Sequence, residues 1–566
     1  MQSHLKVKLP DRNNVYTQNI SMKKYLIILA VTALSRISYA QNEFEYTILK
    51  NNSTKADPVM VPLHAQIEDL LADTEGVHLA DWDEKTHKLN YMHNKKLQRP
   101  IALVKFCDIR WINTLNNIDL TLVTDTTGKT KEAYFRITSE VKLVTKQVEV
   151  KTSQIIDIKQ NNFKSEPRTS LRSDKKDRDI ILIEKFVEEF GGDPAKLKKD
   201  NFDTYNKRLV KVREKYMPQL KERLSELLVL HAGSVVDQLK RFEPLNIGRA
   251  YQVIRDPDSA DEKKIKSVTF DATPNDHVKA GEYVLLYEVV DFNGHKSLRY
   301  VSPFRVDETG EKSAKADLAS LGGKKALAEL MRNKAELVMF DDKRSALAYD
   351  KQLRREKEDY IVGVKKSCVF CNMDLETSLY QLPIVKVVER NAPELVIFQK
   401  LAKLERFIDY GSEELLNKQL GVKYLFYKEE ERLVATDIET GRIIGSERPP
   451  GWLSANYGIA AKNLFIDTFE RPIKFIKNEE VSKGKLKSFI AQSDFGFLFG
   501  ESIGVYELVD EKVGNKVIKR KQEIGDSWFS KPISDTVAEF KVKRGEKEIL
   551  EAQQQGKTLV FEYKIK

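Results

Sequence analysis

Two of the three cysteines have a spacing that could support redox chemistry. Cys368 and Cys371 enclose two residues, between a segment with the pattern of a strand and one with the pattern of a helix. A thiol at the start of a helix has a lowered pKa, which favours thiol–disulfide exchange. However, Ser367 stands where such pairs usually have an aromatic residue, and the strand expected at 421–427 carries no proline. We therefore expect a structural disulfide, and a thiol–disulfide redox protein using this pair is the alternative function.

A second group of side chains contains potential metal ligands. Its members are His78, Asp81, Asp83, His87 and His93. Imidazole and carboxylate groups bind metals, but this spacing matches no recognised metal-binding motif, and Leu79 and Trp82 indicate an ordinary strand end. We interpret the group as a solvated surface without a metal. Cys107 cannot complete a zinc site with the cysteine pair, because such sites need four ligands.

The sequence contains no motif for a catalytic nucleophile or for phosphate binding. A Gly-x-Ser-x-Gly turn and a glycine-rich phosphate loop are both absent. Glu389 and Arg390 end an apolar strand, and we interpret them as a strand-end salt bridge rather than a catalytic pair. The sequence thus predicts a protein that is not an enzyme and needs no cofactor.

Residues 22–40 have the pattern of a signal peptide. A basic start, Met22-Lys23-Lys24, precedes the apolar run 25–34, and small residues precede the expected cleavage site. The apolar run is too short to remain as a membrane-spanning helix. We expect export, with Gln41 as the first mature residue, to the periplasm, the outer-membrane periphery or the cell exterior. Residues 1–21 are interpreted as an extension upstream of the native start.

Length and charge limit the class of protein further. A chain of 566 residues is too long for one core and indicates three or four modules. The 95 basic and 85 acidic residues leave a net charge of +10 on a mixed surface. This small excess, without a basic stripe interleaved with aromatic residues, excludes a nucleic-acid groove.

Hydrophobic periodicity divides the chain into alternating α/β and β-rich lobes. Helical spacing with a break at 191–194 predicts a helical hairpin, and two charged segments without periodicity predict linkers. The expected parts are a first α/β lobe (42–162), a charged linker (163–178), the helical hairpin (179–240), a first β-rich lobe (241–340), a second charged linker (341–358), a second α/β lobe (359–468) and a second β-rich lobe (469–566).

The two halves carry similar short segments in the same order, which predicts two tandem copies of one α+β unit. In each copy an α/β lobe is followed by a β-rich lobe. The matching segments are Leu122–Lys129 with Leu433–Arg442, Phe242–Pro244 with Phe469–Pro472, Tyr287–Asp291 with Tyr506–Asp510, Gly323–Glu329 with Gly545–Glu551, and Leu337–Phe340 with Leu559–Phe561.

The second copy resembles the curli assembly and transport component family of bacterial envelope proteins, which have an anticodon-binding-like α/β lobe. The matching segments are the strand Asp359–Val364, the helix Met373–Leu382, the strand Val385–Arg390, and Leu420–Leu425 with Asp437–Gly441. The resemblance implies an envelope scaffold or assembly accessory. The chain departs from the pore-forming members because it lacks a lipidated cysteine and an obvious membrane-inserting hairpin.

Together these patterns predict a non-catalytic binding and assembly protein of the bacterial cell envelope. Its partners would be other envelope proteins, added through exposed strand edges of the β-rich lobes. Nucleic acid is not expected as a partner, whereas peripheral membrane association and oligomers stay open. A ring-forming secretion component is a further alternative function.

Overall fold

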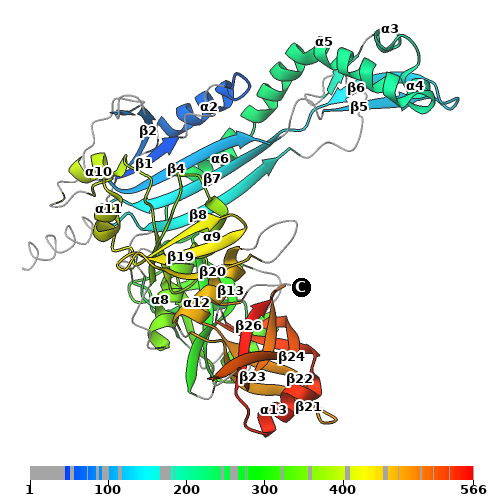
Figure 1. The fold of residues 1–566 in the computed structure, drawn as a ribbon. Coiled ribbons are helices and arrows are strands. Elements are labelled where there is room, and N and C mark those ends of the chain that lie inside the picture. Colours follow the sequence, from blue (N-terminus) through cyan, green and yellow to red (C-terminus); the bar gives the residue numbers. More distant parts are fainter. Residues whose placement is uncertain are drawn as a thin grey trace, which may run out of the picture.

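The chain is described by a computed structural model whose helices and sheets confirm the predicted α+β class (Figure 1). The signal peptide and residues 1–21 lie outside the described residues. The described ranges are 45–50, 57–72, 74, 76–83, 88–91, 101–112, 118–165, 180–183, 185–243, 248–254, 265–273, 276, 278–292, 294–319, 324–354, 360–401, 404, 408–449, 457–469, 471–497, 500–513, 516–534 and 536–564.

The first α/β lobe is a six-stranded mixed sheet in the order β3-β2-β1-β4-β7-β8. The strand β1 is parallel to β2 and β4, whereas β4, β7 and β8 pair in antiparallel fashion. Helix α2 buries Leu63, Ile67 and Leu71, which recur at helical spacing. The elements are β1 (Glu45–Lys50), α2 (Val61–Ala72), β2 (Val77–Asp83), β3 (Lys88–Tyr91), β4 (Ile101–Trp111), β7 (Glu140–Glu149) and β8 (Ile155–Lys164).

The second α/β lobe is a five-stranded sheet in the order β17-β16-β18-β19-β20. Its pairing repeats the first sheet, with β16 parallel to β17 and β18 and the remaining strands antiparallel. The elements are β16 (Tyr360–Val364), α9 (Met373–Tyr380), β17 (Val385–Val388), α10 (Leu395–Leu401), α11 (Glu413–Leu420), β18 (Tyr424–Glu429), β19 (Arg432–Asp437), β20 (Ile443–Glu447) and α12 (Tyr457–Phe469).

The first β-rich lobe is a closed barrel in the order β10-β11-β14-β13-β12-β15. A closed barrel has no edge, so the expectation that this lobe offers an exposed edge to a partner strand is wrong. The elements are β10 (Tyr251–Ile254), β11 (Ser267–Phe270), β12 (Tyr283–Phe292), β13 (His295–Thr309), β14 (Ala314–Leu318), α7 (Lys324–Arg332) and β15 (Glu336–Phe340).

The second β-rich lobe is an open sheet in the order β21-β22-β25-β24-β23-β26. Its edge strand β26 is partly covered by α12, because the side-chain amide of Asn463 donates to the carbonyl of Tyr563 (3.1 Å) and accepts from its N–H (3.2 Å). The elements are β21 (Lys474–Ser482), β22 (Lys485–Gln492), β23 (Ser502–Val513), β24 (Lys516–Pro532), β25 (Val537–Arg544), α13 (Glu546–Gln554) and β26 (Leu559–Lys564).

The two β-rich lobes have the same strand order when their strands are numbered within each lobe, and each has a helix before its last strand. One predicted match does not fall on equivalent strands. Thr127–Lys129 lies in the hairpin between β5 (Asp119–Thr124) and β6 (Thr130–Arg136). Thr440–Arg442 instead joins β19 to β20, which occupy the positions in the second sheet that β7 and β8 occupy in the first. The tandem repeat itself stays a prediction.

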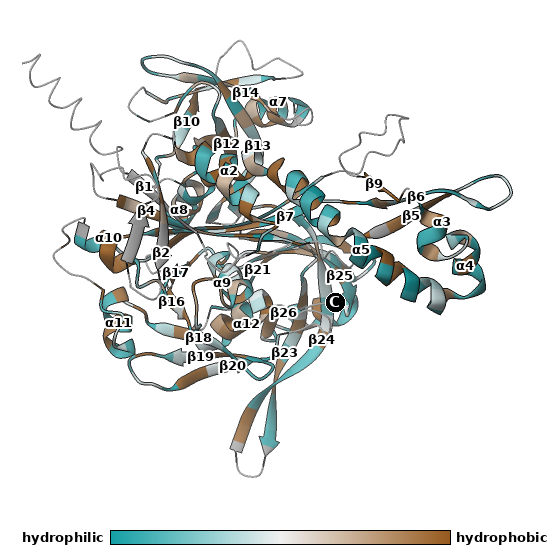
Figure 2. Cartoon of the chain, turned by 90° about the horizontal axis from the view of Figure 1, so that it is seen from above, coloured by the Kyte–Doolittle hydropathy of each residue, from teal (hydrophilic) through white to brown (hydrophobic). Residues whose placement is uncertain are grey.

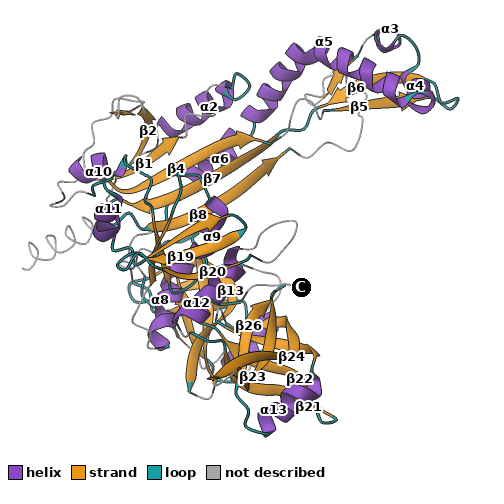
Figure 3. Ribbon diagram, in the orientation of Figure 1, coloured by secondary structure: helices purple, strands orange, loops and turns teal. Residues whose placement is uncertain are grey.

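A lateral arm projects from the first α/β lobe (Figures 1 and 2). Its sheet, in the order β5-β6-β9, is covered by helix α5, which buries Phe135 of β6 (Figure 3). The arm consists of β5 (Asp119–Thr124), β6 (Thr130–Arg136), β9 (Ile180–Leu182), α3 (Phe186–Phe190), α4 (Pro194–Asp200) and α5 (Phe202–Val229), and α6 (Ala232–Leu239) follows it. The segment predicted as a helical hairpin therefore begins with a strand, which is a correction.

The predicted break at 191–194 has a clear local cause. Gly191 ends α3 in the left-handed conformation, which glycine adopts without a steric penalty. Asp193 then caps α4 by accepting from the N–H of Ala195 (2.9 Å), and Pro194 occupies the first helical position. The side chain of Asp193 also accepts from the N–H of Thr130, which ties α4 to the arm sheet.

The segment predicted as the second charged linker contains helix α8 (Lys343–Leu353). Its charged residues pair across the lobes. The segment therefore lacks the apolar periodicity from which a helix is predicted. Asp350 accepts from Ser297 of the barrel (2.8 Å) and pairs with Arg354, which reaches Asp494 of the last lobe (3.1 Å). All four side chains are buried or nearly so, so α8 connects the two β-rich lobes.

No helix among the described residues is long and apolar enough to cross a membrane.

Candidate functional site

The cysteine pair lies in the loop between β16 and α9. Cys368 and Cys371 form a disulfide, with Cα atoms 5.1 Å apart. Cys368 is exposed and Cys371 is half-buried, and the hydroxyl of Ser367 lies 3.4 Å from the Cys371 sulfur. The third cysteine, Cys107, is a buried thiol on β4. The disulfide is therefore accessible to solvent at the start of a helix.

Directly beneath this loop lie four buried charged residues, here called the charge quartet: Lys146, Lys366, Glu376 and Glu389. Their side chains are at most 1% exposed. Lys146 forms an ion pair with Glu376 and donates to Glu389 (2.7 Å). Lys366 donates to the same two carboxylates, at 2.7 Å in each case. Each ammonium group thus contacts both carboxylates.

The quartet joins the two halves of the chain. Lys146 comes from β7 of the first sheet, whereas the other three residues follow β16, lie on α9 and follow β17 of the second. Backbone pairing supports the same joint, because the N–H of Glu389 donates to the carbonyl of Ser153 (2.8 Å). Gln399 also donates to the carbonyl of Val150 (2.8 Å). One apolar core continues across this joint.

The lysines also hold the cysteine loop in place. The carbonyl of Val369, between the two cysteines, accepts from Lys146 (2.5 Å) and from Lys366 (3.1 Å). Asn391 adds two hydrogen bonds to this cluster. Its backbone N–H donates to Glu389 (2.8 Å), and the NH2 group of its side chain donates to the carbonyl of Lys366 (2.8 Å). The loop conformation and the quartet are thus directly connected.

Electrostatics decide the protonation of Glu389. Burial alone would raise the pKa of this carboxyl, but the ammonium groups of Lys146 and Lys366 outweigh that effect and lower the pKa to about 2. The same carboxylates outweigh burial at Lys146 and raise its pKa. Both groups are therefore charged at neutral pH. Burial instead raises the pKa of Glu376 and lowers that of Lys366. With side chains at most 1% exposed, the quartet forms a buried ion-pair network between the two halves.

Glu389 and Arg390 do not pair with each other, in contrast to the predicted strand-end salt bridge. Arg390 donates to the side chain of Asn417 (2.8 Å) and to Glu413 (2.9 Å). Gly363 makes room for it, since a Cβ at that position would lie 2.3 Å from the Cδ of Arg390. The two neighbouring charges therefore stabilise different contacts.

The predicted group of metal ligands lies mostly outside the described side chains. His78 is buried on β2. Asp81 and Asp83 also lie on β2, but their side chains, like all of His87 and His93, are outside the described part. Within the residues that the structure does describe, no three His, Cys, Asp or Glu side chains form a group that could hold a metal ion.

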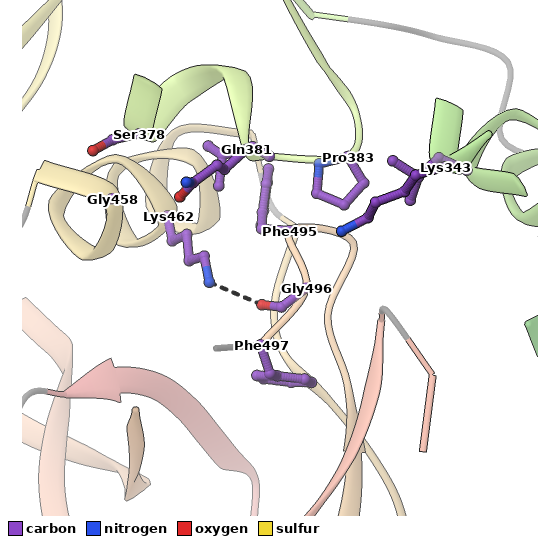
Figure 4. Close-up of a pocket in the computed structure, with 11 residues that line it drawn as sticks. Lys343, Ser378, Gln381, Pro383, Gly458, Lys462, Phe495, Gly496 and Phe497 are labelled. Carbon is purple, nitrogen blue, oxygen red and sulfur yellow. Dashed lines mark hydrogen bonds between the residues drawn. The ribbon is translucent and has the colours of Figure 1, made fainter. Parts of the chain in front are cut away.

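A small cavity of about 90 Å³ lies between α8, α9, α12 and the loop 495–497 (Figure 4). Lys462 on its wall donates to the carbonyl of Gly496 (3.0 Å) and to Glu501 (3.0 Å), so its charge is already neutralised. A volume of this size holds about three water molecules, which is too little for a cofactor.

No family model matches this chain, and no curated protein matches it. Among solved structures it is similar to a flavohemoglobin from Malassezia yamatoensis with bound FAD and heme, at 15% sequence identity and a TM-score of 0.14. The likeness covers 43% of this chain and 62% of that one, so the chain spans less than two thirds of the flavohemoglobin. A TM-score this low does not indicate a shared fold, and neither ligand is implied for this chain.

Proposed function

We propose that this chain is a non-catalytic binding and assembly protein of the bacterial cell envelope, built from two tandem copies. The observation that carries the proposal is the lateral arm, which projects away from the lobes (Figure 1) and exposes apolar and charged side chains. Its partners would be other envelope proteins, reached after export. The resemblance of the second copy to curli assembly components supports the same role.

The outer surface of the arm has the composition of a protein-binding surface. Phe202 and Val210 of α5 are 56% and 49% exposed, and Val187 of α3 is 48% exposed. Exposed charges of both signs lie on α5 as well, including Lys211 and Glu214. Exposed apolar side chains among charged ones are typical of protein-binding surfaces.

The first prediction concerns partner capture by the arm. A photo-reactive phenylalanine analogue placed at Val210 is expected to give discrete crosslinked species in intact cells, because this side chain projects from α5. The matched control is Val61 at the start of α2, which is also a valine on a helix and is 50% exposed. Crosslinks of equal yield at both positions, or at neither, would contradict a binding role for the arm. Gel analysis and mass spectrometry give the readout.

A thiol–disulfide redox function is the second candidate, favoured by the solvent-accessible disulfide before α9. In that reaction a partner dithiol is oxidised to a disulfide while Cys368 and Cys371 are reduced to thiols. A double variant, C368S/C371S, separates the two functions. We expect it to keep the Val210 crosslinks, since the disulfide lies outside the arm. Rapid oxidation of a reduced dithiol peptide by the wild type, lost in the variant, would instead favour the redox protein.

A further inference from the structure

The hairpin β23–β24 extends well beyond the sheet to which it belongs (Figure 2). The strand β26 pairs with β23 only as far as Glu507, and β25 pairs with β24 only from Asp526 onward. The N–H of Leu508 still donates to the carbonyl of Thr558 (3.0 Å), and from Val509↔Arg520 to Val513↔Lys516 the described strands pair only with each other. This part, residues 509–513 and 516–520, is here called the ribbon.

The ribbon exposes apolar side chains near its tip. Val517 is 66% exposed, the highest value among the large exposed hydrophobic residues, and its neighbour Ile518 is 46% exposed. Because successive residues of a strand point to opposite faces, these two side chains lie on opposite faces of the ribbon. An isolated two-stranded ribbon is at best marginally stable in water, so the tip is stabilised by contact with a surface that covers its apolar side chains.

Basic residues accompany both apolar side chains. Lys512 lies directly opposite Val517, and Lys519 follows on the same face. Among the described residues, Lys512 forms no ion pair, whereas Asp510 lies directly opposite Lys519. Arg520 on the other face pairs with Glu511 (3.3 Å). The basic residues of the ribbon outnumber these two acidic ones, so it combines an apolar tip with a net positive charge.

We infer that the ribbon tip docks onto an anionic lipid surface. Val517 and Ile518 project from opposite faces, so a surface that admits the whole tip covers both side chains. A bilayer interface surrounds the tip and covers both, while the lysine stems reach back to the lipid phosphates. Positive charge on the ribbon complements the negative headgroups.

This inference rests on the proposed envelope function and names the surface to which the protein attaches. Its test needs only purified protein and lipid, and no partner protein. A negative vesicle result therefore rejects the lipid contact alone, whereas the Val210 crosslinks test the binding role separately.

The experiment measures co-sedimentation of the protein starting at Gln41 with vesicles of phosphatidylcholine, with and without phosphatidylglycerol. We expect binding that requires phosphatidylglycerol and weakens with salt. The variant K512Q/K519Q is expected to bind roughly 25-fold less tightly, since each basic residue near such a surface contributes a factor of about five. The variant V517D/I518D is expected to bind on the order of 100-fold less tightly, because both apolar side chains leave the interface and two carboxylates face the anionic headgroups.

Matched controls test whether the ribbon itself is responsible. K541Q/K543Q removes the same charge from β25, where both lysines are exposed, and V481D places an aspartate at another exposed valine. Both controls should bind as the wild type does, and unchanged melting curves should show that all variants fold. No vesicle binding by the wild type, or equal binding by V517D/I518D, overturns the inference. A dimer in light scattering that V517D/I518D breaks, without vesicle binding, would identify a second copy as the occupant.

Discussion

Replacing Lys146 with methionine is expected to lower the free energy of unfolding by about 3–5 kcal/mol, the range observed when one partner of a buried ion pair is removed. The side chain of Lys146 is fully buried and forms ion pairs with Glu376 and Glu389. Without it, two buried carboxylates share one ammonium group, that of Lys366. Methionine preserves most of the volume, so the loss reports charge and not a cavity. Denaturant unfolding monitored by circular dichroism measures it.

Two further variants show whether the quartet causes this loss. K142M changes a half-buried lysine of the same strand that forms no ion pair with another described residue, and is expected to change the free energy of unfolding by less than about 1 kcal/mol. K146M/E389Q removes one charge of each sign and is expected to be more stable than the sum of its single variants predicts. If K146M unfolds like K142M, the quartet does not hold the two halves together.

Local sequence patterns were sufficient to predict several elements of the second α/β lobe. The strands at Val385–Val388 and Tyr424–Glu429 and the helix at Met373–Tyr380 overlap the segments expected from their apolar residues, although the helix also buries Glu376. The arm was predicted less well. Strand β9 has three residues, too few for a period, and it forms only because Ile181 lies beside Phe135 of β6, which is distant in sequence. Such pairing is determined by tertiary contacts and not by local propensity.

The charge quartet could not be assembled from the sequence, because Lys146 and Glu389 are 243 residues apart. One signal was nevertheless present. Lys146 is separated by an even number of residues from Val144, Val148 and Val150, so all four side chains point to the same face of the strand. Lys146 therefore places a charge among these apolar residues. A lysine on a buried face is rarely left without a partner, which predicts an acidic residue opposite it. The identity of that residue needs the packing of α9 and β17 against β7.

The close approach at Gly545 gives the second large expected effect. Gly545 ends the connection from β25 to α13 with a φ of +79°, a conformation that costs an L-residue roughly 1–2 kcal/mol. A Cβ there would also lie 2.0 Å from the carbonyl oxygen of Ile524 and 2.7 Å from the Cα of Gly525. Both are backbone atoms of β24, which cannot rotate away. Since the strand itself must move, the G545A variant is expected to lower the free energy of unfolding by more than about 3 kcal/mol.

Gly556 provides a control for the backbone conformation alone. Its φ is +67°, but no atom lies within 4 Å of an added Cβ. The G556A variant is therefore expected to lose only roughly 1–2 kcal/mol, the cost of the left-handed conformation. Thermal melting of both variants measures the difference, which isolates the contact between α13 and β24. Equal losses of stability in the two variants would show that β24 shifts at little energetic cost. The contact between α13 and β24 would then not stabilise the last lobe. A larger loss at Gly545 would mean that only glycine fits where the helix begins, and would explain why the segment starting at this glycine is among those shared by the two halves of the sequence.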